Sequence, residues 1–128
     1  MQLNEYQKSA MTTCTPSSEN FSYMFLNLVG EIGEFASKVA KAIRKDKAYI
    51  DYNRLFSALG DNHLTVAEKA EIRKEAGDIL WQLSGLCTVM GWKLDDVAKE
   101  NLDKLAARKA AGTIVGDGDG IDGKERTA

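Results

Sequence analysis

The chain has 128 residues, of which 44% are hydrophobic and 28% charged, a composition typical of one soluble globular domain. Its 17 basic and 19 acidic residues give a net charge of −2, which provides no overall basic surface for nucleic acid. No apolar run approaches the roughly 20 residues that span a bilayer, and the N-terminus lacks the pattern of a signal peptide. The two cysteines, Cys14 and Cys87, do not resemble a disulfide scaffold. We therefore expect a cytoplasmic protein with reduced thiols that binds neither nucleic acid nor a membrane.

The first half of the chain predicts a short helix and a long one. The short helix covers about residues 3–13 and precedes the single proline, Pro16. Residues 22–45 carry apolar side chains at alternating spacings of three and four, which only a helix places on one face. The members of this apolar stripe are Phe25, Leu28, Ile32, Phe35, Val39 and Ala42 or Ile43.

The second half predicts two further helices. One begins after Thr65, which forms a capping-box pattern with Glu68, and ends at Gly91, the residue expected in a left-handed conformation. Its apolar stripe also alternates between spacings of three and four: Ile72, Ala76, Ile79, Leu83, Leu86 and Met90. The last helix extends from about Leu94 to Ala110. The sequence therefore predicts an all-α helical bundle of the four-helix type.

The domain organisation follows from these helices. Residues 1–110 form the predicted helical domain, and residues 46–64 form an inserted connection between the two long helices. The apolar content of this connection is consistent either with a short extra helix that packs on the bundle or with a mobile lid. Residues 111–128 are rich in Gly and Asp and predict a flexible C-terminal tail, whose aspartates lack the closing glutamate of an EF-hand.

Each long helix carries two acidic residues spaced three apart: Glu31 with Glu34, and Glu75 with Asp78. At about 100° per residue, Glu75 falls close to or within the apolar arc around Ile79. A carboxylate there must be paired, bound to a cation or neutralised, because isolated burial costs several kcal/mol. If the helices pack as an antiparallel hairpin, the four carboxylates converge, and Mg²⁺ or Mn²⁺ is the natural cation for such oxygen ligands.

Acidic pairs at this spacing are also common on solvated helix faces, so the neighbouring residues matter. Gly30, Gly33 and Gly77 flank the two pairs. Because glycine costs a helix interior about 1 kcal/mol relative to alanine, these glycines indicate a close approach of backbone or ligand. A di-iron site would instead need Glu-x-x-His pairs, and the only histidine, His63, lies in the connection.

The last helix adds positive charge. Asn101, Lys104 and Arg108 share one face because they are spaced three and four apart. A basic face beside a carboxylate–metal cluster fits a polyphosphate, whose remaining charge Lys and Arg neutralise. Taken alone, these cations are also typical of a solvated face. Lys38, on the acidic face of the first long helix, is a weaker candidate for the same role.

These segments resemble the MazG-like all-α nucleotide pyrophosphohydrolases. The resemblance covers about residues 22–110 and rests on three motifs in the expected order: Gly30–Glu34, Glu75–Trp81 and Asn101–Arg108. One departure is the length of the connection, because the forty residues from 35 to 74 exceed what is usual for the family.

The resemblance implies hydrolysis of a nucleoside triphosphate, with a deoxynucleotide as the expected substrate, to the monophosphate and pyrophosphate. It implies Mg²⁺, for which Mn²⁺ can substitute, held by four carboxylates: Glu31, Glu34, Glu75 and Asp78. It also implies a homodimer or homotetramer in which a neighbouring subunit often completes the active site.

The same resemblance implies roles for individual residues. Lys104 and Arg108 would contact phosphates during catalysis, and Asn101 would help to orient the nucleotide. Glu34 is our candidate for the group that accepts the proton of the attacking water. Candidates for stacking on the base are aromatic: Trp81, Phe21 and Tyr23. For Trp81, a role in the core is equally consistent with the sequence.

A different class of function remains open at this point. The apolar stripes would serve equally well in a non-catalytic, oligomeric helical module that binds nucleotide or a protein partner. This alternative predicts solvent-exposed acids and no effect of Mg²⁺, whereas the enzyme predicts a crowded acidic site that a cation stabilises.

Overall fold

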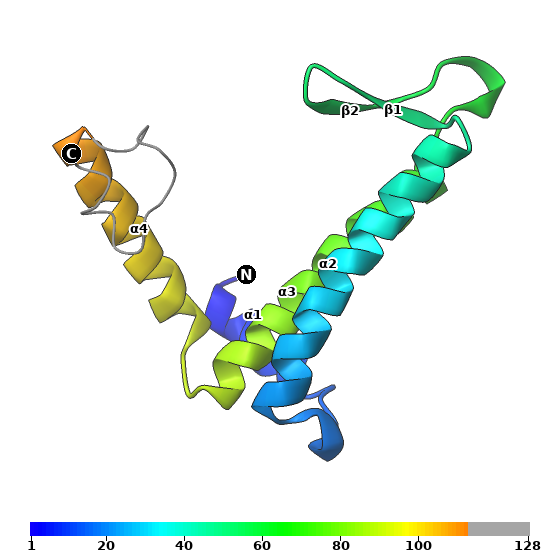
Figure 1. Cartoon of the computed structure of the whole chain (residues 1–128). Helices are drawn as coiled ribbons and strands as arrows, with labels where there is room; N and C mark the ends of the chain where they lie inside the picture. Colours follow the sequence, from blue (N-terminus) through cyan, green and yellow to red (C-terminus); the bar gives the residue numbers. More distant parts are fainter. Residues whose placement is uncertain (113–128) are drawn as a thin grey trace.

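The computed structural model describes residues 1–112, and the predicted Gly/Asp-rich tail from residue 113 onward lies outside this part of the chain. The all-α class is confirmed, with four helices inside the described part (Figure 1): α1 Leu3–Met11, α2 Phe21–Arg44, α3 Val66–Val89 and α4 Leu94–Ala111. Their bounds lie within about two residues of those predicted from periodicity and capping. None of these helices combines the length and apolarity that crossing a membrane requires.

Local hydrogen bonds explain where α3 begins and ends. The Thr65 hydroxyl accepts a hydrogen bond from the backbone N–H of Glu68 at 3.1 Å, and the Glu68 carboxylate accepts one from the Thr65 N–H at 3.0 Å. This reciprocal pair is the predicted capping box. At the other end, Gly91 has a φ of +74°, and the Trp92 N–H donates to the Cys87 carbonyl at 2.8 Å. The left-handed glycine therefore closes the helix as predicted.

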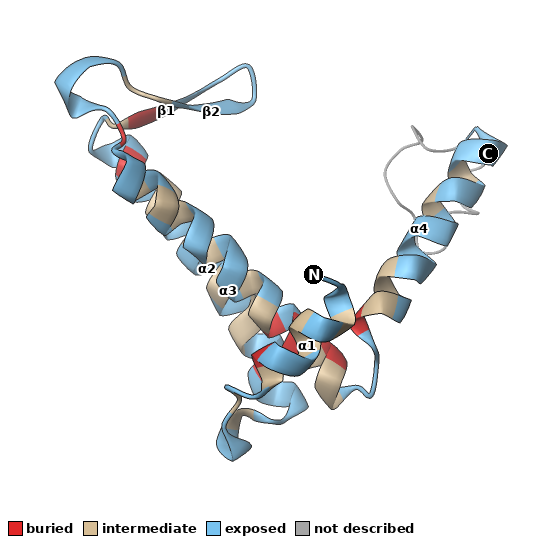
Figure 2. Ribbon diagram, turned by 180° about the vertical axis from the view of Figure 1, so that it is seen from behind, coloured by how far each residue is buried: buried red, intermediate tan, exposed pale blue. Residues whose placement is uncertain are grey.

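The two long helices α2 and α3 pack against each other as an antiparallel hairpin (Figure 1). At one end of this hairpin, Met24 and Cys87 are almost completely buried, and a Cβ added to Gly85 would overlap the Met24 side chain. At the other end, Ala42 and Leu64 form a small core with the first residue of the connection's sheet. Figure 2 shows these two regions of burial, one near α1 and one at the root of the connection.

The connection over residues 46–64 contains a β-hairpin, so the predicted extra helix is wrong. Strand β1, Ala48–Asp51, pairs antiparallel with strand β2, Arg54–Ser57. Tyr52 and Asn53 have φ values of +48° and +62°, as a two-residue hairpin turn with both residues in the left-handed region requires. Strands of four residues are too short to produce a clear alternation in the sequence, and the Tyr-Asn turn lacks the usual glycine. The lid interpretation is not tested by this arrangement.

The apolar stripe of α2 is only partly covered within this chain. Ala42 is buried as predicted, but Phe25 and Ile32 are 46% and 52% exposed. Their neighbours Leu26 and Val29 are still more exposed, at 66% and 57%. The reason is that α3 covers one side of α2 while α4 extends away from both helices as a second arm (Figure 1). A large apolar face of α2 therefore remains open.

Helix α1 lies where α4 diverges from the α2–α3 hairpin (Figure 1). It supplies side-chain caps for the N-terminus of α4, where Lys93 provides none. The Gln7 side-chain oxygen accepts a hydrogen bond from the Leu94 N–H at 2.8 Å, and the Asn4 oxygen accepts one from the Asp95 N–H at 2.9 Å. The Gln7 amide also donates to the Trp92 carbonyl at 2.9 Å. Two side chains from α1 thus satisfy the first free N–H groups of α4 and fix its starting point.

We expect Gln7→Ala to lower the free energy of unfolding by about 1–2 kcal/mol, because it removes a helix cap and leaves a polar junction without its partner. Chemical denaturation followed by circular dichroism measures this difference. Lys8→Ala is the matched control, since Lys8 is exposed and adjacent. Equal stability of the two variants would show that α1 does not hold α4 in this way.

Candidate metal-binding site

Three acidic side chains meet between α2 and α3. Glu31 from α2 and Glu75 and Asp78 from α3 each place one carboxylate oxygen within 4.8 Å of the other two. Glu31 and Glu75 are partly buried, whereas Asp78 is exposed. The antiparallel packing of the helices creates this acidic cluster, because it brings the first acid of the α2 pair opposite both acids of the α3 pair. Hard divalent cations such as Mg²⁺ and Mn²⁺ prefer such a set of oxygen ligands.

The negative charges in the acidic cluster repel one another. Burial, followed by the charges of Asp78, Glu75 and Glu34, raises the pKa of Glu31 above its usual value. Lys38 brings a positive charge to the cluster, since its Nζ lies 3.7 Å from a Glu75 carboxylate oxygen. One ammonium does not balance three carboxylates, so the cluster carries excess negative charge that a metal ion would neutralise.

Two amide side chains, Asn27 and Gln82, connect Glu31 to the interior through hydrogen bonds. The Asn27 amide nitrogen lies 3.4 Å from a Glu31 carboxylate oxygen and donates to the Gln82 oxygen at 2.7 Å. Gln82 is 2% exposed, and its own amide nitrogen lies 3.5 Å from the Met24 carbonyl. This chain of amides connects Glu31 to the buried contact between α2 and α3. Sequence analysis did not single out Gln82, although a polar residue beside an apolar stripe is a detectable signal.

The structure gathers three of the four predicted metal ligands. Glu34, the fourth, is exposed and lies one helical turn beyond Glu31. Its charge still contributes to the raised pKa of Glu31, which indicates that it is close to the cluster. Among residues 1–112, nothing lies within 4 Å of where a Cβ would be at Gly33 or Gly77, so no described residue approaches them closely. The close approach that those glycines indicated is instead found at Gly85.

The predicted phosphate-binding residues are not beside the acidic cluster within this chain. Asn101, Lys104 and Arg108 belong to the outer half of α4, and α4 forms the arm that extends away from α2 and α3 (Figures 1 and 2). The reason is that α4 packs on α1 rather than along the α2–α3 hairpin. Lys38, the weaker candidate, is the cation that reaches the cluster.

Three aromatic residues, Trp81, Tyr6 and Phe21, have different surroundings. The Trp81 indole N–H donates to the Ala10 carbonyl at 3.2 Å and to the Thr13 hydroxyl at 2.9 Å, so this side chain anchors α1 on α3. Tyr6, which sequence analysis gave no role, lies near Asp78, since burial and then the charge of Asp78 raise the pKa of its hydroxyl. Phe21 is 53% exposed.

Comparison with known proteins relates most of this chain to a described family. Residues 19–112 match the MazG nucleotide pyrophosphohydrolase domain, a range that contains α2, the connection, α3 and α4. The Gene 37 protein of Mycobacterium phage L5 is 36% identical over 103 residues, which cover 80% of this chain and 78% of that protein. No solved structure matches the chain.

We expect Glu31→Gln to stabilise the metal-free protein at pH 7 by about 0.5 kcal/mol, the scale of like-charge repulsion between partly exposed groups. Because the folded-state pKa of Glu31 is raised, its ionisation destabilises the fold as pH increases from the unfolded value of 4.5 through the folded value. The gain should therefore disappear below pH 4.5. Thermal unfolding in a chelating buffer across this pH range provides the measurement.

The matched control is Glu19→Gln, an exposed position outside the acidic cluster. A Glu31→Gln variant that is less stable than this control at pH 7 would contradict the repulsion inferred from the geometry.

Proposed function

The chain belongs to the MazG nucleotide pyrophosphohydrolase family, and from this premise we propose that it hydrolyses a nucleoside triphosphate to the monophosphate and pyrophosphate in a Mg²⁺-dependent reaction. A deoxynucleotide is the proposed substrate, and Mn²⁺ is proposed to substitute for Mg²⁺. The observation that carries this proposal is the convergence of Glu31, Glu75 and Asp78, whose oxygens lie within 4.8 Å of one another. A bound cation would relieve the repulsion among three carboxylates this close, and the family relationship supplies a reaction for it.

In the proposed mechanism the acidic cluster holds the metal, and the residues around it prepare the reaction. When bound, Mg²⁺ supplies charge stabilisation at the phosphoryl oxygens and a lower pKa for water. Glu31 is held in position by the amide of Asn27, which itself contacts buried Gln82. Glu34 is exposed and close to the cluster, so it is free to accept the proton of the attacking water.

The phosphate contacts are proposed to come from a second copy of the chain. Within one chain, Asn101, Lys104 and Arg108 lie on the separate α4 arm, while the apolar face of α2 around Leu26 and Val29 is open. Covering this face with a second copy would form a homodimer or homotetramer and would allow α4 of one copy to approach the acidic cluster of the other. Exposed apolar faces of this kind mark interaction sites.

Lys38 is proposed to contact the substrate as well. Its Nζ lies 3.7 Å from the Glu75 carboxylate, and a metal ion bound there would neutralise the negative charge that attracts the Lys38 ammonium. The ammonium would then be available to a phosphate oxygen. For the base, Phe21 and Tyr23 are more accessible than Trp81, because the indole N–H of Trp81 is engaged with α1. Trp81 remains a proposed contact through its ring alone.

The non-catalytic module is supported by one observation, the open apolar face of α2, which any oligomeric protein would explain equally well. That alternative predicts solvent-exposed acids. The Glu75 side chain is only 13% exposed, and Glu31 is also partly buried. The enzyme accounts for both the oligomer surface and the crowded acids, and we therefore favour it.

We expect the chain to release pyrophosphate from at least one member of a panel of ribo- and deoxynucleoside triphosphates when Mg²⁺ or Mn²⁺ is present, and from none in a chelating buffer. Glu75→Gln and Glu34→Gln should each lower kcat/KM by about 100-fold or more, as the loss of a metal ligand or a general base does. Glu19→Gln is the control and should retain activity. Coupled detection of pyrophosphate measures all of these rates.

Two results would contradict the proposed function. One is the absence of pyrophosphate release from every triphosphate of the panel, which would favour the non-catalytic module. The other is metal-dependent release that persists unchanged in Glu75→Gln, which would place the chemistry away from the acidic cluster.

We expect the chain to sediment with the mass of a dimer or tetramer, and Leu26→Lys with Val29→Lys to shift it toward the monomer. Burying two ammonium groups in an apolar interface would cost several kcal/mol, enough to dissociate most dimers at micromolar concentration. Analytical ultracentrifugation measures the mass. Leu59→Lys, in the connection and 92% exposed, is the control. A monomeric wild-type chain would refute this arrangement.

A further inference from the structure

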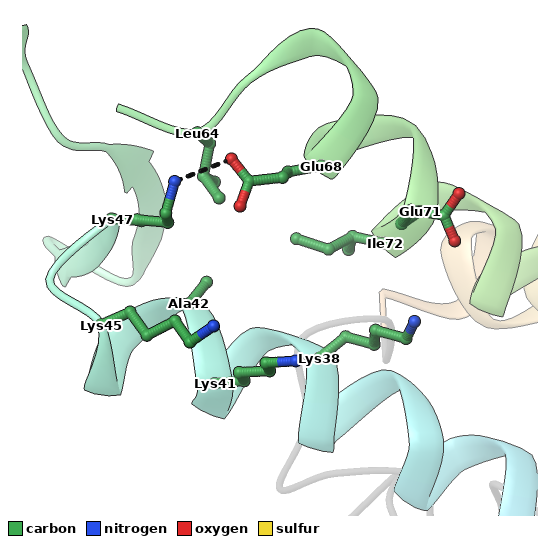
Figure 3. A pocket seen from close by; sticks show the side chains of 9 residues that line it. All are labelled: Lys38, Lys41, Ala42, Lys45, Lys47, Leu64, Glu68, Glu71 and Ile72. Carbon is green, nitrogen blue, oxygen red and sulfur yellow. Dashed lines mark hydrogen bonds and ion pairs between the residues drawn. The ribbon is translucent and has the colours of Figure 1, made fainter. Parts of the chain in front are cut away.

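A basic pocket of about 180 Å³ lies between the C-terminal part of α2 and the N-terminal part of α3 (Figure 3). Two of its lysines come from α2, a third directly follows α2, a fourth comes from the start of the connection, and two glutamates come from the facing side of α3. These charged residues are Lys38, Lys41, Lys45, Lys47, Glu68 and Glu71. The pocket is separate from the acidic cluster but adjoins it, because Lys38 lines the pocket and also approaches Glu75.

The two glutamates of this basic pocket already have partners. A hydrogen bond from the Thr65 N–H, and next the ammonium of Lys47, lower the pKa of Glu68 to about 2. The Lys47 Nζ lies 3.0 Å from the Glu68 carboxylate. Glu71 is paired at 2.9 Å with Lys74, which does not line the pocket. The acids of the lining therefore leave part of its positive charge uncompensated.

Lys41 and Lys45 carry this uncompensated charge. Within residues 1–112, neither ammonium forms an ion pair with a carboxylate. Figure 3 shows both side chains on the α2 side of the pocket, next to Lys38 and below the apolar residues Ala42 and Ile72. Both side chains are exposed, and a multiply charged anion between them would be attracted by both ammonium groups.

The size and the donors of the basic pocket define the class of anion. A volume of about 180 Å³ is smaller than the roughly 300–1,000 Å³ of sites for drug-sized ligands, which suits a small anion rather than a whole nucleoside. The lining has lysines and no arginine, so it offers several point charges rather than a planar fork for a carboxylate. Several point charges from the α2 side suit a multiply charged phosphate group.

We propose that the basic pocket binds inorganic pyrophosphate through Lys41 and Lys45, with Lys38 between this anion and the acidic cluster. The choice of pyrophosphate among small phosphate anions rests on the proposed function, in which it is the product released beside the cluster. The position of the basic pocket supports this choice, because the pocket lies between the same two helices as the acidic cluster, and Lys38 both lines the pocket and approaches Glu75. The leaving group would therefore have a neighbouring site to enter.

The test is calorimetric titration of pyrophosphate into the full chain in a metal-free, chelating buffer at about 0.1 M salt, where exposed charges are already screened beyond about 10 Å. The pocket variant is Lys41→Gln with Lys45→Gln. The control variant is Lys8→Gln with Lys93→Gln, which removes the same charge from exposed positions outside the pocket. Circular dichroism checks that both variants are folded. We expect the pocket variant to bind at least ten-fold more weakly and the control variant to bind within about two-fold of the wild type.

Three outcomes would overturn the inference. Wild-type chain that does not bind pyrophosphate would exclude the site. Equal binding by the pocket and control variants would show that Lys41 and Lys45 only offset the negative C-terminal end of the α2 dipole. Sulfate that binds as tightly as pyrophosphate would show a general attraction for anions and not a pyrophosphate site.

The experiment also separates this inference from the proposed function. Binding in a chelating buffer needs neither metal nor turnover, so a chain that binds pyrophosphate in the basic pocket and hydrolyses nothing would refute the proposed function alone. Conversely, metal-dependent pyrophosphate release by a chain whose pocket variant binds like the control would refute the inference alone.

Discussion

The close packing of α2 on α3 is the contact on which the rest of the molecule depends. It is closest where the Met24 side chain occupies the space that a Cβ at Gly85 would need, and where the Gln82 amide lies 3.5 Å from the Met24 carbonyl. From Gln82 the contact continues to Asn27 and then to Glu31. The same packing that buries the methionine therefore determines which carboxylates face one another. A shift of one helix by a turn would separate Glu31 from both acids of α3.

The charge between α2 and α3 changes sign along the hairpin. Near the middle of the hairpin lie three carboxylates that repel one another, and nearer the connection lie the four lysines and two glutamates of the basic pocket. Lys38 and Glu75, 3.7 Å apart, lie at the boundary between the two regions. This order matches the charges of the proposed reactants, since a metal ion would bind in the acidic part and a phosphate anion in the basic part. Each ligand would neutralise charges that the chain alone leaves in excess.

Within the single chain, α4 diverges from the α2–α3 hairpin, and this arrangement has identifiable causes and consequences. Asn4 and Gln7 of α1 cap the first N–H groups of α4 and so direct it away from the α2–α3 hairpin. One consequence is that the apolar face of α2, with Val29 57% exposed, has no partner within the chain. Another is that the basic residues of α4 are separated from the acidic cluster. The proposed association of two copies would remove both consequences, and the proposed oligomer and the proposed active site therefore depend on each other.

The sequence by itself determined the helices, the two ends of α3 and the acidic residues from which the cluster is built. The spacing of apolar residues predicts which face of each helix is apolar, and the Thr65–Glu68 capping box and Gly91 predict where α3 begins and ends. The two acidic pairs predict which residues form the cluster. All of these signals depend only on residues within a few positions of one another. Only the tertiary structure decided which groups meet. It placed Glu34 outside the set of three acids, directed α4 away from the α2–α3 hairpin, formed a β-hairpin from residues 46–64 and assembled the basic pocket. These features depend on how distant segments are oriented, and local periodicity does not contain that information.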